Sequence, residues 1–181
     1  MKQLRIGDRV RTGGGRDNEA DEYSEVYAFL DRKPQGEFDY IRVKLENGQA
    51  LEISPRHRIF KQKGKDLIDV DARDLAAGDL VQVYHDQVWK LIKVIDIEQI
   101  QREGAFAPVT LSGTILVDQV LASCYAMASH QAAHTAFAPL RLAHQLLPAV
   151  HDQQQDQDQE QEQGLHWYAD FLYQTFGSMY E

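Results

Sequence analysis

The alternation of apolar and polar residues predicts β-strands along most of the first 125 residues. Between residues 41 and 53 apolar positions alternate with polar ones, interrupted by ENGQ at 46–49. Asn-Gly tolerates the positive φ angles of a type I′ turn, so this pattern predicts a hairpin. The glycines at 13–15 and the KPQG sequence at 33–36 are expected to form further turns.

A second alternating stretch, VLASCYA at residues 120–126, places Cys124 on the same strand face as small side chains. The composition changes after this strand. Residues 126–147 are rich in Ala, Leu, His and Gln and contain no glycine. Their spacing predicts short helices that are broken near Pro139.

The last part of the chain combines a polar stretch with an aromatic one. Residues 151–163 contain only His, Gln, Asp and Glu, and such a segment cannot bury enough apolar surface to fold. We expect it to be a mobile linker, followed by a short amphipathic helix at 167–172. The chain is therefore divided into a β domain at 1–126 and a helical appendage at 127–181.

One phrase occurs twice in the β domain. Residues 4–10 (LRIGDRV) and 75–81 (LAAGDLV) both read Leu-x-x-Gly-Asp-x-Val, and apolar runs follow at 26–30 and 91–97. A spacing of about seventy residues is too long for a solenoid repeat. It indicates two related halves around a pseudo-two-fold axis, with a site where the halves meet.

Composition and charge narrow the possible functions. A chain of 181 residues with 43% apolar residues can bury an ordinary core. The net charge of −9 argues against nucleic acid as a partner. Cys124 is the only cysteine, which excludes an internal disulfide and a cysteine-based zinc cage. We find no targeting signal and no run of eighteen apolar residues in this chain.

Candidate chemistry follows directly after the predicted hairpin, in the sequence SPRH. The hydroxyl of Ser54 and the imidazole of His57 are three residues apart and can converge on one peptide bond. The alternative is a turn serine beside a hydrogen-bonded histidine. The other histidines are scattered; His130 and His134 could share a helix face, but we expect no metal site.

Several longer strings stand in order along nearly the whole chain. They are LDR at 30–32, FAPVT at 106–110, GTILV at 113–117, VLASCYA at 120–126, AH at 133–134, FAPLRL at 137–142 and GLHWY at 164–168. Together with the doubled Gly-Asp phrase, these strings resemble the C-terminal autoprocessing domain of Hedgehog proteins. The resemblance implies a mainly β Hint fold with two duplicated halves, followed by a sterol recognition region with a short helical tail.

The resemblance also implies a self-processing enzyme that acts once, in cis. In this family a cysteine that opens the domain attacks the preceding carbonyl and converts an amide into a thioester. The 3-hydroxyl of cholesterol then attacks the thioester and releases the signalling domain as a cholesterol ester. The implied partners are that N-terminal signalling domain and cholesterol, a co-substrate, with no cofactor. The full precursor would use the secretory pathway, through the endoplasmic reticulum, to reach the extracellular space.

Three residues match catalytic positions of the family. His57 would donate a proton to the amide nitrogen, and Ser54 stands where many members carry threonine. Asp31 matches the aspartate that would accept the proton of the sterol hydroxyl. The alternative for Asp31 is a surface salt bridge with Arg32 or Lys33.

Cys124 matches the second cysteine of the family, which can form a disulfide with the nucleophile, and we expect it to be a buried, unreactive thiol. The initiating cysteine and first strand of the family have no counterpart before Leu4. As given, the chain therefore cannot form the thioester by this route. We expect a truncated sequence; the alternative is a catalytically dead module that binds sterol or lipid.

The tail carries the expected sterol-binding side chains. An aromatic and apolar surface can hold a flat apolar ligand or associate with a membrane surface. The alternative is that these residues pack the tail helices on the β domain. The candidates are His134, Phe137, Leu140, Leu142, His166, Trp167, Tyr168 and Phe171.

Overall fold

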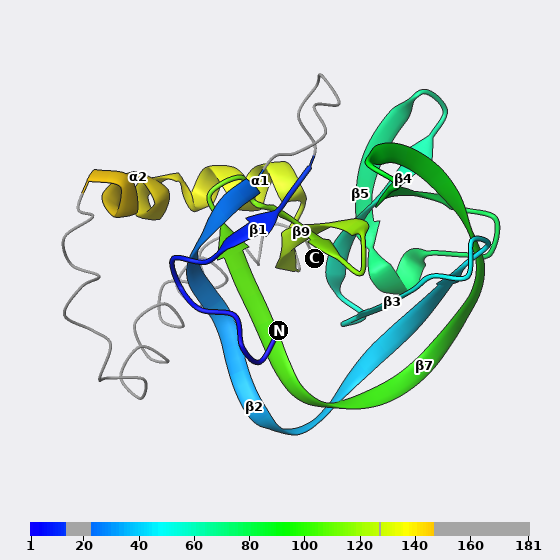
Figure 1. Cartoon of the computed structure of the whole chain (residues 1–181), viewed down its shortest axis with the longest axis horizontal. Helices are drawn as coiled ribbons and strands as arrows, with labels where there is room; N and C mark the ends of the chain where they lie inside the picture. Colours follow the sequence, from blue (N-terminus) through cyan, green and yellow to red (C-terminus); the bar gives the residue numbers. More distant parts are fainter. Residues whose placement is uncertain (14–22, 127, 147–181) are drawn as a thin grey trace.

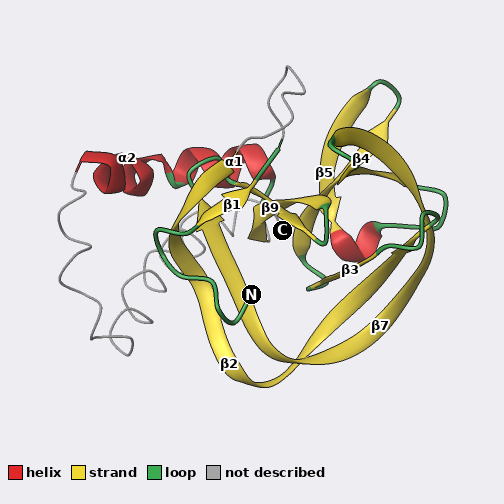
Figure 2. Ribbon diagram, viewed as in Figure 1, coloured by secondary structure: helices red, strands yellow, loops and turns green. Residues whose placement is uncertain are grey.

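A computed structural model describes residues 1–13, 23–126 and 128–146, and its architecture is mainly β, as predicted (Figure 2). The predicted linker at 151–163 and the helix at 167–172 lie outside the described residues. The strands are β1 (Arg9–Arg11), β2 (Tyr23–Leu45), β3 (Ala50–Ile53), β4 (His57–Lys63), β5 (Asp66–Asp71), β6 (Leu80–His85), β7 (Val88–Thr110), β8 (Thr114–Val117) and β9 (Val120–Ala126). The helices are the 3-10 turn η1 (Ala72–Asp74), α1 (His130–Ala136) and α2 (Ala138–Leu146).

Two long strands of 23 residues each, β2 and β7, form the frame of the molecule. They pair antiparallel along their length and curve together as one ribbon (Figure 1). The main strand order is β1-β2-β7-β6-β4-β9-β8, while β3 pairs with β2 and β5 pairs with β4. The predicted hairpin is the β2–β3 pair, in register from Ile41 opposite Ile53 to Lys44 opposite Ala50.

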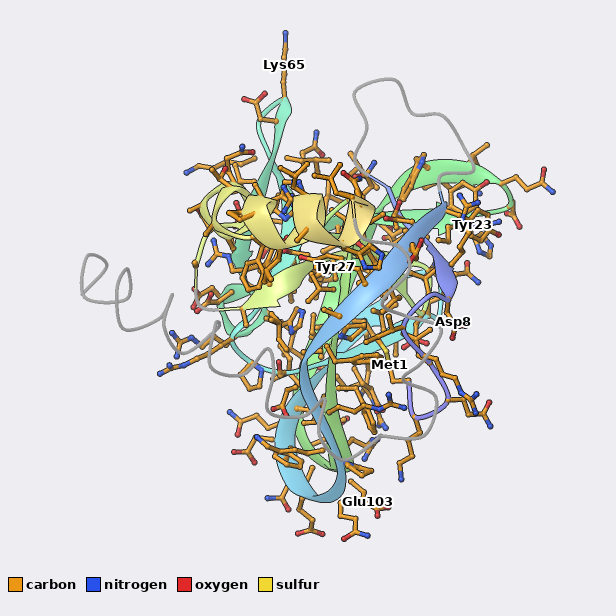
Figure 3. The ribbon with its side chains drawn as sticks, turned by 90° about the vertical axis from the view of Figure 1, so that its left-hand side faces the viewer. Met1, Asp8, Tyr23, Tyr27, Lys65 and Glu103 are labelled. Carbon is orange, nitrogen blue, oxygen red and sulfur yellow. The ribbon has the colours of Figure 1, made fainter. Side chains whose placement is uncertain are left out.

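The turn predicted at 33–36 is wrong, because these residues lie inside β2. Lys33 of β2 pairs with Ala105 of β7, and the next pair is Glu37 with Glu103. The chain thus advances four residues on β2 but only two on β7 between these pairs. This is a bulge in a continuing ladder: β7 pairs on both sides of it, so the chain bends without reversing. Figure 3 labels Glu103 at the foot of the molecule, where the ribbon turns.

The first Gly-Asp phrase clamps the start of β2. The Gly7 N–H donates to the Val26 carbonyl at 2.8 Å, and the Val26 N–H donates to the Asp8 carbonyl at 2.8 Å. The Asp8 carboxylate closes the phrase by accepting the Arg5 N–H at 2.8 Å. Gly7 has a φ of 91°, in a region that residues with a Cβ rarely enter.

The second phrase repeats these contacts on β7. The Gly78 N–H donates to the Val94 carbonyl, and the Val94 N–H donates to the Asp79 carbonyl, both at 2.8 Å. The Asp79 carboxylate accepts the Ala76 N–H at 2.9 Å, and Gly78 has a φ of 100°. The sequence repeat is thus a repeat of hydrogen bonds, and the prediction of two related halves is confirmed.

The helical tail packs on the same core as the strands. Ala133 and Phe137 of α1 join the buried cluster that includes Tyr125 of β9. The predicted break between helices falls at Phe137, and Pro139 lies in the first turn of α2, where its missing N–H costs no hydrogen bond. Among the described residues, neither helix has the length and apolar character needed to cross a bilayer.

We predict that Gly78→Ala lowers the free energy of unfolding by about 1–2 kcal/mol, because the added methyl forces a strained backbone. No atom lies within 4 Å of a Cβ built there, so the cost comes from φ alone. Gly7→Ala should cost a similar amount in the duplicated phrase. Urea unfolding measures both, with the exposed Ala77→Ser as the control; unchanged midpoints for both glycine variants would contradict the clamp.

Candidate functional site

Ser54 and His57 meet at the connection between β3 and β4. The His57 N–H donates to the Ser54 carbonyl at 3.0 Å, and the Arg73 N–H of η1 donates to the Pro55 carbonyl at 2.9 Å. This turn places the Ser54 Oγ 3.4 Å from the His57 Nδ1. The structure therefore brings together the two side chains that the sequence paired.

The other ring nitrogen of His57 is fixed by β9. Its Nε2 lies 2.9 Å from the carbonyl oxygen of Ser123. A carbonyl can only accept a hydrogen bond, so the neutral ring carries its proton on Nε2 and directs the lone pair of Nδ1 toward Ser54. Burial lowers the pKa of His57, and the hydrogen bond to Ser123 opposes this shift only in part. His57 is therefore a neutral imidazole whose Nδ1 can accept a proton.

Asp31 lies on a different strand from this pair. It stands on β2 opposite Ala107 of β7, and its carboxylate pairs with Lys33 at 3.2 Å. Within the described part of the chain, Asp31 makes no hydrogen bond to Ser54 or His57. Its local contact is thus the salt bridge that the sequence left open as the alternative.

Tyr40 interacts electrostatically with both Asp31 and Glu52. Burial raises the pKa of Tyr40, and the carboxylates of Asp31 and Glu52 raise it further. Its hydroxyl donates to the Gly104 carbonyl at 3.2 Å, across the bend of the ribbon. Both carboxylates therefore act on the Tyr40 hydroxyl, and Glu52 precedes Ser54 by two residues.

Glu52 is the centre of a cluster of ion pairs two residues before Ser54. Its carboxylate accepts from Arg102 at 2.7 Å twice and from Arg42 at 2.8 and 3.0 Å. The hydrogen bonds from Arg102, and then those from Arg42, lower the pKa of Glu52 to about 2, against the effect of burial. The hairpin register alone could have paired Glu52 with Arg42, whereas Arg102 comes from a strand fifty residues later.

Cys124 is buried, as the strand pattern predicts, with 1% of its surface exposed. Its Sγ lies 3.5 Å from the Thr110 Oγ1, and its N–H donates to the Gly113 carbonyl at 2.8 Å. Burial raises the pKa of the thiol to about 11, although the Thr110 hydrogen bond works in the opposite direction. Such a thiol is a poor nucleophile near neutral pH.

The candidate sterol-binding residues of the tail fall into two groups. His134 bonds Tyr125 (Nδ1 to hydroxyl, 3.1 Å), the ring of Phe137 lies 5.4 Å from that of Tyr125, and Leu140 packs against the core. Leu142 differs, with 55% of its surface exposed. The remaining candidates lie outside the described residues: His166, Trp167, Tyr168 and Phe171.

His130 and His134 do share a face of α1, with their rings stacked at 5.7 Å. Each uses its Nδ1 within the protein, His130 toward the Ser123 hydroxyl and His134 toward that of Tyr125. In the described ranges, no group of three or more His, Cys, Asp or Glu side chains is placed to hold a metal ion.

Comparison with known proteins identifies the family. The family model described as the Hint module matches residues 1–180. The chain belongs to the Hint module family. Among curated proteins, the Tiggy-winkle hedgehog protein of Danio rerio is 35% identical over 181 residues, covering 96% of this chain and 43% of the relative. Protein hedgehog of Drosophila virilis is 34% identical over 190 residues, covering 97% and 39%.

This Hint module therefore spans about two fifths of the length of these hedgehog relatives. Solved structures agree on the fold. The Ssp DnaB mini-intein variant M86 has a TM-score of 0.55 at 10% identity, covering 68% of this chain and 78% of the intein. An intein from a hyperthermophile has a TM-score of 0.52 at 15% identity, covering 64% and 70%.

We predict that the module loses stability as the pH falls below about 6.5, the ordinary pKa of histidine. Burial lowers the pKa of His57, His130 and His134, the last to about 4, where Arg141 and then His130 add repulsion. Below pH 6.5 the unfolded chain binds more protons than the folded one, so protonation favours unfolding.

Urea midpoints at pH 7.5 and pH 5 test this expectation. The midpoint should be lower at pH 5, and His134→Gln should reduce the difference between the two values. Ala77→Ser, which changes an exposed side chain that does not titrate, is the control and should leave the difference unchanged. Equal midpoints at the two pH values would contradict the expectation.

We also predict that Cys124 resists alkylation while the module is folded. The buried, protonated thiol should react with iodoacetamide at least about a hundredfold more slowly than a free cysteine peptide at pH 7.5, and should reach the peptide rate in urea. Mass spectrometry of the labelled protein measures both rates. Rapid labelling without urea would show that the thiol is accessible.

Proposed function

We propose that this Hint module is the autoprocessing domain of a Hedgehog-type precursor. It would cleave the peptide bond before a cysteine in the segment that precedes residue 1 and transfer the released acyl group to cholesterol. The observation that carries this proposal is the arrangement of His57 between Ser123 and Ser54: a neutral imidazole, fixed at Nε2, with its Nδ1 lone pair facing a hydroxyl.

In the first step, the cysteine sulfur attacks the carbonyl carbon of the preceding residue. The Nδ1 of His57 accepts the thiol proton, and the Ser123 carbonyl stabilises the resulting imidazolium through Nε2–H. As the tetrahedral adduct collapses, the carbon–nitrogen bond breaks and His57 returns the proton to the leaving nitrogen. The Ser54 hydroxyl can hold the scissile amide by a hydrogen bond during this step.

The position of the first described residues supports the proposal that the cysteine precedes residue 1. Burial and the Glu52 carboxylate raise the pKa of Asp118, while the amino group of Met1 lowers it. The Lys2 Nζ pairs with Glu103 at 3.6 Å, and the adjacent Arg102 binds Glu52, which is two residues from Ser54 (Met1 and Glu103 are labelled in Figure 3). A segment that continues before Met1 would begin on this side of the molecule.

In the second step, Asp31 would accept the proton of the cholesterol 3-hydroxyl as that oxygen attacks the thioester carbon. The carbon–oxygen bond forms, the carbon–sulfur bond breaks, and the cysteine leaves as a thiol or thiolate. A carboxylate is a weak base toward an alcohol, so this role depends on position and partial desolvation. Leu142 and Leu146, four residues apart and both exposed, give α2 an apolar side for sterol or for a membrane surface.

The biological setting is part of the proposal. The relatives are named hedgehog proteins, and this chain covers only part of each. We infer that an N-terminal signalling domain, joined in cis, is the acyl donor and that the precursor follows the secretory route. The product would be a signalling protein with cholesterol esterified to its C-terminus.

We predict that a precursor with a reporter domain, a cysteine-bearing linker strand and this chain cleaves itself when dithiothreitol or cholesterol is added. Asp31→Ala should retain dithiothreitol cleavage and lose cholesterol cleavage, because only the sterol needs a base in the second step. His57→Ala should slow both reactions by about 10²- to 10⁴-fold. Gel electrophoresis and mass spectrometry of the reporter measure the products.

His85→Ala is the matched histidine control and should cleave at the wild-type rate. A folded wild-type precursor that stays intact with both nucleophiles would refute the proposed function. Equal losses from Asp31→Ala and His57→Ala in both reactions would refute the division of roles.

A further inference from the structure

Ser123 connects the candidate catalytic histidine to the tail helix. Its backbone carbonyl accepts the Nε2–H of His57 at 2.9 Å, and its Oγ lies 2.9 Å from the Nδ1 of His130, the first residue of α1. No part of Ser123 is exposed to solvent. One buried residue therefore contacts both imidazole rings, through its backbone on one side and its hydroxyl on the other.

The direction of these hydrogen bonds follows from the partners. The Ser123 Oγ accepts the N–H of Tyr125 at 3.1 Å, and we assign its own proton to the Nδ1 of His130, which lies 2.9 Å away. His130 is thus an acceptor at Nδ1 and is neutral there. Burial lowers the pKa of His130, and the nearby Asp69 carboxylate opposes this shift, so the neutral ring is the stable form near neutral pH.

A second link fixes the start of α1 through Asp69 of β5. The backbone N–H of His130 donates to the Asp69 Oδ2 at 2.8 Å, and the same carboxylate oxygen accepts from the Arg58 Nε at 2.8 Å. Arg58 directly follows His57 in β4 and also bonds Asp71 at 2.7 Å. The His130 backbone and side chain therefore contact β5 and β9, two strands that pair with β4.

We propose that His130 is a positioning residue for His57. By accepting the Ser123 hydroxyl, it holds the Ser123 carbonyl against the His57 Nε2 and so keeps the Nδ1 lone pair directed at Ser54. This inference rests on the proposed function, in which that lone pair moves the proton of the first step. The start of the tail helix then belongs to the apparatus for amide cleavage as well as to the sterol region.

The alternative is that His130 only fills space between α1 and β9. Its ring does pack on Phe60, with centroids 5.2 Å apart in an edge arrangement. The two roles make different demands on a replacement. A packing role needs an apolar side chain of similar volume, whereas a positioning role needs an acceptor where Nδ1 stands. Leucine supplies the volume without the acceptor, and the Oδ1 of asparagine supplies the acceptor near the Nδ1 position.

The first test reads the His57 ring directly, in the full chain labelled with ¹⁵N. Two-bond ¹H–¹⁵N spectra distinguish the Nε2–H from the Nδ1–H tautomer. We expect a single Nε2–H tautomer in the wild type, a mixture in His130→Leu, and recovery of the wild-type spectrum in His130→Asn. Ser123→Ala, which removes the hydroxyl with little change of volume, should resemble His130→Leu and serves if the leucine variant does not fold. An unchanged tautomer in the folded variants that lack this hydrogen bond would overturn the proposal.

The second test uses the cleavable precursor with dithiothreitol. His130→Leu should cleave about five- to tenfold more slowly, the loss expected for one hydrogen bond, and His130→Asn should recover most of the rate. His85→Leu is the control and should match the wild type. Equal rates for all variants, or equal loss in the leucine and asparagine variants, would overturn the positioning role. A wild-type precursor that does not cleave would refute the proposed function, and the tautomer measurement would still decide the role of His130.

Discussion

The antiparallel ladder between β2 and β7 is the constraint on which the rest of the structure depends. Each strand is clamped near its start by a Gly-Asp phrase, and each clamp centres on a fully buried valine, Val26 or Val94. The ladder runs through a bulge that bends both strands together instead of reversing either. The strands β3 and β6 attach to this frame directly, and β4 and β9 through β6, which fixes where the connection between β3 and β4 can lie.

The candidate site is assembled from strands that this frame positions. Ser54 and His57 stand where β3 ends and β4 begins, and β9 supplies the Ser123 carbonyl that selects the tautomer of His57. Asp31 is carried on the frame itself, on β2 opposite Ala107, and its carboxylate pairs with Lys33. The two proposed steps would thus draw on different strands, which agrees with their needing different nucleophiles.

Local sequence patterns were sufficient to predict part of this structure. The β2–β3 hairpin, the repeated Gly-Asp phrase, the buried strand around Cys124 and the break before Pro139 all follow from spacing within a few residues. The KPQG sequence failed as a turn signal, because whether Gly36 ends a strand depends on a partner almost seventy residues away. The contacts of Glu52 with Arg102 and of His57 with Ser123 could not be predicted from the sequence for the same reason. Each contact joins segments that are far apart in the sequence and meet only when the chain has folded.

Ser123 contacts His57 through its backbone carbonyl, and this limits how the sequence of β9 can vary. Successive carbonyls of a strand point in opposite directions, so only one residue in this stretch of β9 can present its oxygen to His57. An exchange of Ser123 that keeps a hydroxyl preserves both that oxygen and the contact with His130, whereas inserting or deleting one residue between Ala122 and Tyr125 reverses the alternation. Such a change would turn the carbonyl away from the imidazole and move the Cys124 thiol to the opposite face. At position 123 the strand should therefore accept a substitution that keeps the hydroxyl more readily than any change in the length of the strand.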